Sequence, residues 1–242
     1  MSEVLARGAI ELGLDLTAEQ LRLFDRYADF LLSAGRRAGV TAIATRERVD
    51  QRHFVESLAV AKALLDARIL DEAAASDVLD VGTGGGFPGF PVKILLPQLR
   101  LTLLDARERT TAFLRELLRS LGIEGVEVVT ARAEDAGRDA TYRERFDLVL
   151  ARAVAPLPVL LELTLPFLRH GGHLATPKGS GALREVAASG HALEILGGRI
   201  ASSKPLKVQG SVHNQRLVLV RKVASTPARY PRRAGIPKKR PL

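Results

Sequence analysis

A chain of 242 residues without cysteine is long enough to bury a full core, and it excludes disulfide bonds, thiolate metal sites and cysteine nucleophiles. The N-terminus lacks the basic start and apolar core of a signal peptide, and no apolar run reaches membrane-spanning length. We therefore expect a cytoplasmic protein with no membrane-embedded part.

The net charge of +9 is concentrated at the C-terminus. Residues 221–242 hold eight basic residues and no acidic one, so the first 220 residues carry a net charge of only about +1. The eight are Arg221, Lys222, Arg229, Arg232, Arg233, Lys238, Lys239 and Arg240. A polycationic segment of this kind favours a partner rich in phosphates, such as a nucleic acid backbone. A second interpretation is a segment that only keeps the protein in solution.

Two helical patterns come first along the chain. Thr17 and Gln20 have the spacing of a capping box, and apolar residues then recur on one helical face until Gly35. A second apolar stripe runs over residues 49–66. Together they predict a helical cap over residues 1–70.

After Asp77 the pattern changes to short apolar segments that alternate with helical ones. The segments that resemble strands are 77–81, 99–104, 126–129, 146–151, 173–176 and 216–220. Residues 107–122 have the spacing of an amphipathic helix that stops at Gly122. This alternation predicts an α/β domain over residues 71–222, with a doubly wound, mainly parallel sheet that binds ligands at the carboxyl ends of its strands.

A glycine-rich loop, GTGGGFPG, follows the first strand. It is not a phosphate-binding P-loop, because Lys93 lies too far along and lacks the hydroxyl neighbour of that motif. Gly84 to Gly89 does match the G-x-G-x-x-G dinucleotide fingerprint. However, the count should begin at Gly82, the first glycine after the strand, and the third glycine then falls on Phe87. This register disfavours an NAD(P)-dependent oxidoreductase, which stays as a second hypothesis.

The register that fits is an acidic residue, Asp80, before the glycines Gly82 and Gly84. It resembles the first motif of S-adenosyl-L-methionine-dependent methyltransferases of the Rossmann-like class I. That cofactor presents an ammonium and a sulfonium, which a carboxylate favours, and glycines allow close approach of the backbone. Asp105 ends the next strand about 20 residues later, where a carboxylate can accept from ribose hydroxyls. The resemblance implies S-adenosyl-L-methionine as cofactor and a seven-stranded sheet.

Further segments carry a more specific resemblance. They are RHFVESL (52–58), DVGTGGGFPGFPVKI (80–94), RAED (132–135), ARAVAPL (151–157), PKG (177–179) and TPARYPRRAGIPKKRPL (226–242). In these the chain resembles the bacterial small-subunit rRNA methyltransferase G family, also called glucose-inhibited division protein B. The resemblance implies methylation of guanine N7 (guanine 527 in standard rRNA numbering) in the 530 loop of 16S rRNA. The implied partner is that RNA or the small ribosomal subunit, and we expect a monomer without a metal.

The motif and the resemblance also imply site residues. Cofactor contacts are expected at Asp80, Gly82, Gly84, Phe87, Asp105, Ala106, Ala133, Glu134 and Arg152. Phe87 is expected to pack against the cofactor and Glu134 to bind its adenine end. Arg152 and Lys178 follow the fourth and fifth strands, where we expect them to hold the target nucleotide or its phosphates. For both, a second interpretation is a salt bridge that orders a loop. One interpretation of His53, next to Arg52, places it at the same cleft, but a lone histidine on a helix is more often structural and we expect no catalytic role for it.

The chemistry agrees with what the chain lacks. The fourth strand is followed by ARAVAPL and not by the Asp/Asn-Pro-Pro-aromatic run usual for methylation of exocyclic amines, and cytosine C5 methylation needs a cysteine. Guanine N7 has a free lone pair and loses no proton, so positioning suffices and we assign no general base. Two further hypotheses are a non-catalytic RNA-binding protein with this fold, which the intact Asp80 and Asp105 disfavour, and a small-molecule methyltransferase, which leaves the basic segment unexplained.

Some positions depart from the family pattern. Gly39, Val40 and Thr41 replace Asn-Leu-Thr, and Glu56 replaces an aspartate. An arginine of the pattern falls on Gln215, where the adjacent Arg216 is a candidate substitute.

The C-terminal segment, residues 223–242, alternates proline, glycine and basic residues without apolar periodicity. We expect it to be flexible alone and to order along RNA phosphates. Deleting residues 226–242 is therefore expected to weaken RNA binding in a salt-dependent way while sparing cofactor binding.

Overall fold

The computed structural model describes residues 3–206, 208 and 214–242, and a seven-stranded sheet lies at its centre. The strands are β1 (Asp77–Val81), β2 (Arg100–Asp105), β3 (Val126–Thr130), β4 (Phe146–Leu150), β5 (Leu168–Lys178), β6 (Gly198–Leu206) and β7 (Gln215–Lys222). Their order in the sheet is β3-β2-β1-β4-β5-β7-β6. The first five strands in this order are parallel to one another, and β7 is antiparallel to both β5 and β6. This topology confirms the expected Rossmann-like class I fold, and it places the switch point between β1 and β4.

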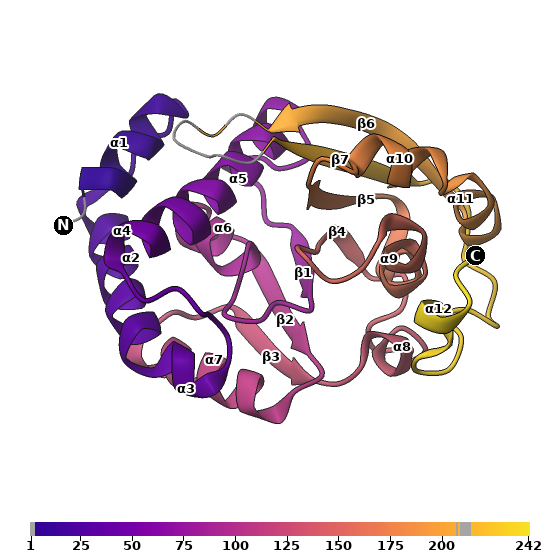
Figure 1. Cartoon of the computed structure of the whole chain (residues 1–242), viewed down its shortest axis with the longest axis horizontal. Coiled ribbons are helices and arrows are strands. Elements are labelled where there is room, and N and C mark those ends of the chain that lie inside the picture. Colours follow the sequence, from indigo (N-terminus) through magenta and orange to yellow (C-terminus); the bar gives the residue numbers. More distant parts are fainter. Residues whose placement is uncertain (1–2, 207, 209–213) are drawn as a thin grey trace.

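Helices cover both faces of the sheet. They are α1 (Glu3–Glu11), α2 (Ala18–Phe30), α3 (Arg36–Ala38), α4 (Arg46–Val49), α5 (Glu56–Asp66), α6 (Gly89–Leu95), α7 (Glu108–Leu121), α8 (Ala133–Ala136), α9 (Leu157–Thr164), α10 (Ala182–Ala187), α11 (Gly190–Leu196) and α12 (Ile236–Lys239). Figure 1 shows α2, α5, α6 and α7 on one side of the sheet and α8, α9 and α11 on the other.

Each strand of the sheet contributes to two cores. Val78 packs in one core with the N-terminal helices, whereas its neighbour Leu79 packs in the other with α9 and α11. Successive side chains of a strand point to opposite faces, so a strand buried on both faces is apolar along most of its length. Phe24 and Phe54 of the N-terminal helices belong to the first core. The helical cap and one face of the sheet therefore form the first of these two cores together.

The predicted capping box is confirmed at the start of α2. Oγ1 of Thr17 accepts from the backbone N–H of Gln20 at 3.2 Å, and Oε1 of Gln20 accepts from the N–H of Thr17 at 2.9 Å. The side-chain amide of Gln20 also donates to the carbonyls of Ile94 and Leu95, at 3.0 Å each. The same residue thus caps α2 and fastens it to the end of α6.

Two π-helical turns interrupt the N-terminal helices. One, Leu31–Gly35, joins α2 to α3, and the other, Asp50–Val55, joins α4 to α5. Such turns occur frequently at functional sites. The second turn carries Arg52 and His53.

Strand β6 has no counterpart among the predicted strands. Among the residues that the structure describes it is an edge strand that pairs with β7 alone, and it is polar and partly exposed along most of its length. An edge strand has one unpaired side and tolerates polar residues and proline, so its sequence lacks the apolar run that reveals a central strand.

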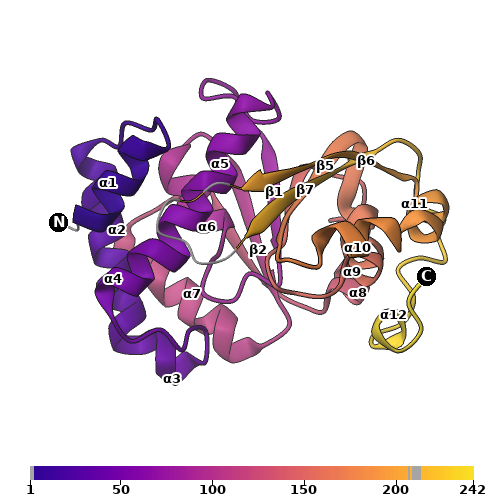
Figure 2. The ribbon, with the colours of Figure 1, turned by 45° about the horizontal axis from the view of Figure 1, so that its top comes forward.

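The C-terminal segment packs against the domain, which differs from the expectation of a flexible tail. Tyr230 is buried, and the guanidinium of Arg232 pairs with the buried carboxylate of Glu162 on α9 at 2.6 Å. Figures 1 and 2 show α12 folded back beside α8 and α9. The composition of this segment predicted flexibility because composition carries no information about Glu162, the partner of Arg232 that lies 70 residues away in the sequence.

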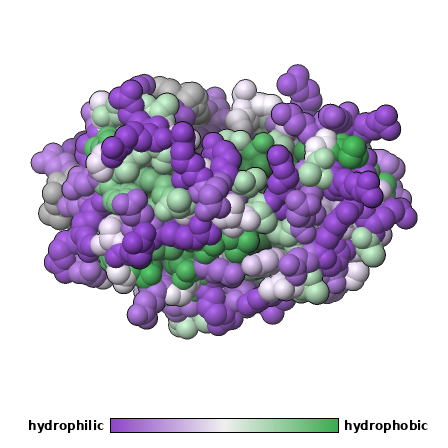
Figure 3. Space-filling view, turned by 90° about the horizontal axis from the view of Figure 1, so that it is seen from below, coloured by the Kyte–Doolittle hydropathy of each residue, from purple (hydrophilic) through white to green (hydrophobic). Residues whose placement is uncertain are grey.

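Seen from below, hydrophilic residues frame apolar ones that gather near the middle of that face (Figure 3). In the part of the chain that the structure describes, no helix combines the length and the apolar character needed to cross a membrane.

Candidate active site

Four loops meet at the carboxyl edge of the sheet. They follow β3, β2, β1 and β4, which are neighbours in that order, and they begin with Ala131, Ala106, Gly82 and Ala151. Most of the predicted site residues lie on these loops or at the strand ends, and the open α/β architecture places ligands here. The topology therefore brings together residues that lie up to about 70 positions apart.

The glycine loop needs its glycines for backbone conformation and for space. Gly82, Gly84 and Gly86 have positive φ angles of 66°, 57° and 102°, which side chains rarely tolerate. A Cβ built on Gly84 would meet nothing within 4 Å, so open space lies in front of this backbone. A Cβ on Gly82 would lie 2.8 Å from a methyl group of Val154, in the loop after β4.

Asp80 lies beneath the loop and not in the open space. Its Oδ2 accepts from the Thr83 hydroxyl at 2.8 Å and from the Gly89 N–H at 2.9 Å. The residue is fully buried, and burial raises its pKa to about 7 against the effect of these hydrogen bonds. Asp80 thus fastens the glycine loop to the start of α6.

Asp105 faces the glycine loop from the end of β2. Its Oδ2 accepts from the N–H of Gly84 at 3.1 Å, and its Oδ1 accepts from the N–H of Arg107 at 3.0 Å. Ala106 beside it is exposed. The backbone N–H of Ala131 donates to the carbonyl of Asp105 at 3.2 Å, which joins the end of β3 to the same place. A carboxylate therefore lies between the glycine loop and α8.

Ala133 and Glu134 form the first turn of α8, beyond Asp105. Ala133 is half-buried and Glu134 is buried. Oε1 of Glu134 accepts from the backbone N–H of Gly235 at 2.9 Å, so the C-terminal segment contacts this edge of the sheet.

Phe87 is enclosed by protein side chains. Its ring stacks on that of His53 at 4.2 Å between centroids and on that of Tyr27 at 5.5 Å, and only 4% of the residue is exposed. The guanidinium carbon of Arg152 lies 5.2 Å from the centre of the same ring.

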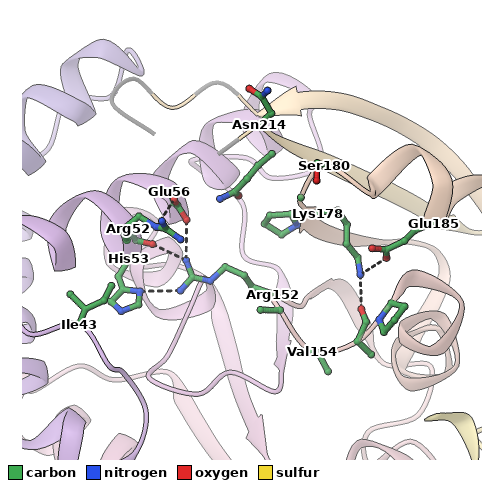
Figure 4. Close-up of a pocket in the computed structure, with 16 residues that line it drawn as sticks. Ile43, Arg52, His53, Glu56, Arg152, Val154, Lys178, Ser180, Glu185 and Asn214 are labelled. Carbon is green, nitrogen blue, oxygen red and sulfur yellow. Dashed lines mark hydrogen bonds and ion pairs between the residues drawn. The ribbon is translucent and has the colours of Figure 1, made fainter. Parts of the chain in front are cut away.

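Arg152 bridges the loop after β4 and the π-helical turn (Figure 4). It donates to the carbonyl of Arg52 at 3.1 Å and to Nδ1 of His53 at 3.2 Å, and it lies 3.7 Å from the carboxylate of Glu56. Burial lowers the pKa of Arg152, and Glu56 opposes this effect. His53 thus holds Arg152 in place and stacks on Phe87.

Lys178 holds a loop in place, as the salt-bridge interpretation of this residue predicts. Its Nζ donates to the carbonyl of Ala155 at 2.6 Å and lies 2.9 Å from Oε2 of Glu185. The same Oε2 accepts from the N–H of Leu157 at 2.7 Å. Lys178 and Glu185 together therefore order the segment that leads from Arg152 into α9.

A pocket of about 930 Å³ opens between Arg152, with its partners on the π-helical turn, and the Lys178–Glu185 pair. Its lining comes from the π-helical turn, the loops after β4 and β5, α10 and the start of β7 (Figure 4). The residues are Ile43, Arg52, His53, Glu56, Arg152, Ala153, Val154, Ala155, Pro156, Pro177, Lys178, Gly179, Ser180, Glu185, Asn214 and Gln215. A cavity of this volume accommodates a ligand as large as a nucleotide.

Comparison with known proteins agrees with this geometry. Residues 20–217 match the family model described as rRNA small subunit methyltransferase G. The chain is 40% identical over 242 residues to ribosomal RNA small subunit methyltransferase G of Pelotomaculum thermopropionicum, covering 100% of this chain and 99% of that protein. It is 42% identical over 240 residues to the protein of the same name from Roseiflexus sp., covering 99% of each. The chain belongs to the rRNA small subunit methyltransferase G family.

Solved structures with low sequence identity share the fold of this methyltransferase G family member. The mitomycin 7-O-methyltransferase MmcR has a TM-score of 0.53 at 20% identity, covering 74% of this chain and 56% of that one. TYW2 of M. jannaschii, solved with AdoMet, has a TM-score of 0.50 at 15% identity, covering 69% and 77%.

Sequence reasoning missed part of the pocket of this methyltransferase G family member. Glu185 carried no signal, because its partner Lys178 is adjacent only in the folded chain. Arg216 does not take the place of the missing arginine, since its guanidinium bonds to Ser203 on β6 while Gln215 lines the pocket. Neighbours on a strand point to opposite faces, so Arg216 cannot reach where Gln215 lies.

Proposed function

We propose that the protein transfers a methyl group from S-adenosyl-L-methionine to N7 of guanine 527 in the 530 loop of 16S rRNA. The main support is Arg152, which lies where two sites meet. Its loop packs on Gly82 through Val154, at the edge of the glycine loop, and its side chain lines a pocket of nucleotide size. Family membership over nearly the whole chain supports the same reaction class.

The residues present fit the cofactor. The open space before Gly84 is a cradle that any side chain would fill, and the Asp105 carboxylate beside it suits hydroxyl donors. Ala106 and Ala133 offer small side chains for a flat ring, and Glu134 offers a carboxylate beyond them. Asp80 acts from beneath by holding the loop. When bound, the cofactor supplies an electrophilic methyl group on a sulfonium.

The chain's own task is to place the base. Guanine N7 carries a free lone pair and no proton, so orientation at near-attack distance accounts for catalysis without a base. His53 cannot take up a proton at neutral pH, because burial and two arginines lower its pKa to about 3. It is therefore suited to holding Arg152 and not to general base catalysis.

Small-subunit rRNA fits the charge of the molecule. Exposed basic side chains of the C-terminal segment include Arg229, Arg233, Lys238 and Lys239. Such side chains neutralise phosphates and make binding dependent on salt. A base in an RNA loop must be unstacked before it can enter a pocket, so we expect local opening of the RNA. We also propose that the enzyme acts as a monomer, which sedimentation analysis tests.

The deciding experiment is methyl transfer from labelled S-adenosyl-L-methionine to 30S subunits that lack N7 methylation in the 530 loop, with the modification mapped by nucleotide. Naked 16S rRNA is assayed in parallel. Label at guanine 527 on either substrate is the expected result. Label at another nucleotide would mean that the target is not guanine 527. Cofactor binding without any methyl transfer would favour a non-catalytic RNA-binding protein. Binding of NAD(P)H in place of the methyl donor would favour the oxidoreductase.

A further inference from the structure

The C-terminal arm, residues 226–242, is bonded to the two helices that follow β3 and β4. On one side, the backbone N–H of Gly235 donates to Oε1 of Glu134 on α8 at 2.9 Å. On the other side, Arg232 pairs with Glu162 on α9. The arm therefore joins two elements that both begin at the carboxyl edge of the sheet (Figures 1 and 2).

Backbone carbonyls of the arm also receive the basic side chains that follow α8. Nε of Arg138 donates to the carbonyl of Pro231 at 2.7 Å, and Nη1 of Arg143 donates to that of Tyr230 at 2.8 Å. A Cβ built on Gly137 would lie 3.1 Å from the Pro231 ring, so the backbone after α8 lies directly on the arm. Together these specific contacts fix the position of the arm relative to α8.

The contact with α9 is a two-pronged ion pair. Nε of Arg232 donates to Oε1 of Glu162 at 2.9 Å and Nη2 donates to Oε2 at 2.6 Å, while the backbone N–H of Arg232 also donates to Oε1 at 2.7 Å. Only 1% of Glu162 is exposed. A buried carboxylate needs its partner, so Arg232 anchors the arm strongly.

Glu134 lies where a ligand on the glycine loop would end. A molecule that starts at Gly84 and passes Asp105 reaches the first turn of α8, because the end of β3 is bonded to Asp105. One carboxylate oxygen of Glu134 is held by the arm. The direction of the other oxygen therefore depends on where the arm lies.

The geometry points to the C-terminal arm as a structural part of the cofactor site, with Arg232 as a positioning residue that sets the orientation of Glu134. This inference rests on the proposed use of S-adenosyl-L-methionine. It replaces the expectation that loss of the arm spares cofactor binding. Because binding energies are reciprocal, the cofactor must in turn stabilise the arm.

The first test is calorimetric titration of the full-length protein with S-adenosyl-L-methionine. We expect Arg232→Gln to weaken binding at least fivefold and Arg232→Lys, which keeps the ion pair, to restore part of the loss. The control is Arg233→Gln, which removes the same charge from an exposed neighbour and should bind within twofold of the wild type. Binding by Arg232→Gln within twofold of the wild type would overturn the inference.

The second test uses the wild-type protein and so does not depend on whether a variant folds. Hydrogen exchange is measured with and without saturating S-adenosyl-L-methionine. Peptides from residues 226–242 should exchange several-fold more slowly when the cofactor is bound, whereas residues 67–76, at the amino edge of the sheet, should not change. Unchanged exchange in the arm of a protein that binds the cofactor would refute the coupling alone. A wild-type protein that shows no cofactor binding would refute the proposed function as well.

Discussion

Nη2 of Arg152 donates a hydrogen bond to Nδ1 of His53 at 3.2 Å, and this contact leaves the imidazole one tautomer. Since Nδ1 accepts, the ring proton lies on Nε2, which donates to Oγ1 of Thr41 at 2.9 Å. The Thr41 hydroxyl also accepts from the N–H of Ile43 at 3.1 Å. His53 is therefore a neutral link between Arg152 and the segment before α4.

The histidine gives the first prediction, which concerns stability and pH. The pKa of His53 is lowered to about 3 in the folded protein, chiefly by burial, while the unfolded chain titrates near 6.5. The unfolded state thus binds more protons between these values, and the His53 contribution to stability falls as pH drops below about 6.5. Relative to wild type, His53→Asn should gain about 1 to 2 kcal/mol between pH 7 and pH 5 in urea unfolding. A constant difference between the two proteins would show that folding leaves the pKa of His53 unchanged.

Asp80 should show the opposite trend. Its folded pKa is raised to about 7 by burial, so the stability it contributes is full below the unfolded pKa and is lost as pH rises through 7. Asp80→Asn keeps an acceptor for Thr83 and Gly89, and we expect it to gain about 2 kcal/mol on wild type between pH 5 and pH 8. Asp80→Ala, which loses both hydrogen bonds, should be destabilised at every pH. Because His53 and Asp80 oppose each other, the test compares each variant with wild type and not the wild-type curve alone.

Arg152 should not tolerate replacement by lysine. A lysine keeps the charge but cannot reach the carbonyl of Arg52 and the ring of His53 at once, because it lacks the planar fork. We expect Arg152→Lys to fold and to lose at least tenfold in kcat/KM for methyl transfer. The exposed Arg169→Lys serves as the matched control and should retain activity. Wild-type activity of Arg152→Lys would mean that charge alone matters at this position.

Lys178 and Glu185 should behave as one unit. Both hold the segment from Ala155 to Leu157, so Lys178→Ala and Glu185→Gln should raise the KM for RNA by similar factors. The double variant should be little worse than either single one, because the interaction is already lost. Direct binding of an RNA phosphate by Lys178 predicts a different result. In that case only Lys178→Ala would reduce the salt dependence of binding.

The basic arm should contribute to RNA binding through its exposed charges. Glutamine at Arg229, Arg233, Lys238 and Lys239 removes those charges and leaves the Arg232 anchor intact. If each of the four side chains neutralises one phosphate in the wild type, the slope of log K against log salt should become less steep by about 3 in the variant. The combination Arg7→Gln with Arg22→Gln, on the N-terminal helices, shows the effect of losing two charges away from the arm. An RNA affinity equal to that of wild type at every salt concentration would argue that the arm does not touch RNA.

Much of the fold could be predicted because its causes are local. The Thr17 capping box, the Gly122 end of α7 in the left-handed conformation and the apolar strands are properties of short stretches. Once a parallel sheet is predicted, residues that end neighbouring strands must lie together, which is why Asp105 and Arg152 could be placed beside the glycine loop. Strand β6 was not predicted, because an edge strand needs little apolar character.

The sequence by itself determined the strands of the sheet other than β6, the register of the glycine loop and the residues at the carboxyl edge of the sheet, since each depends on spacing along the chain. Only the tertiary structure decided that Asp80 lies beneath the loop, that Lys178 pairs with Glu185, and that the basic arm is anchored through Arg232 to Glu162. These outcomes depend on which polar groups become buried together. A buried charge must find a partner in space, and no spacing along the chain encodes where that partner is.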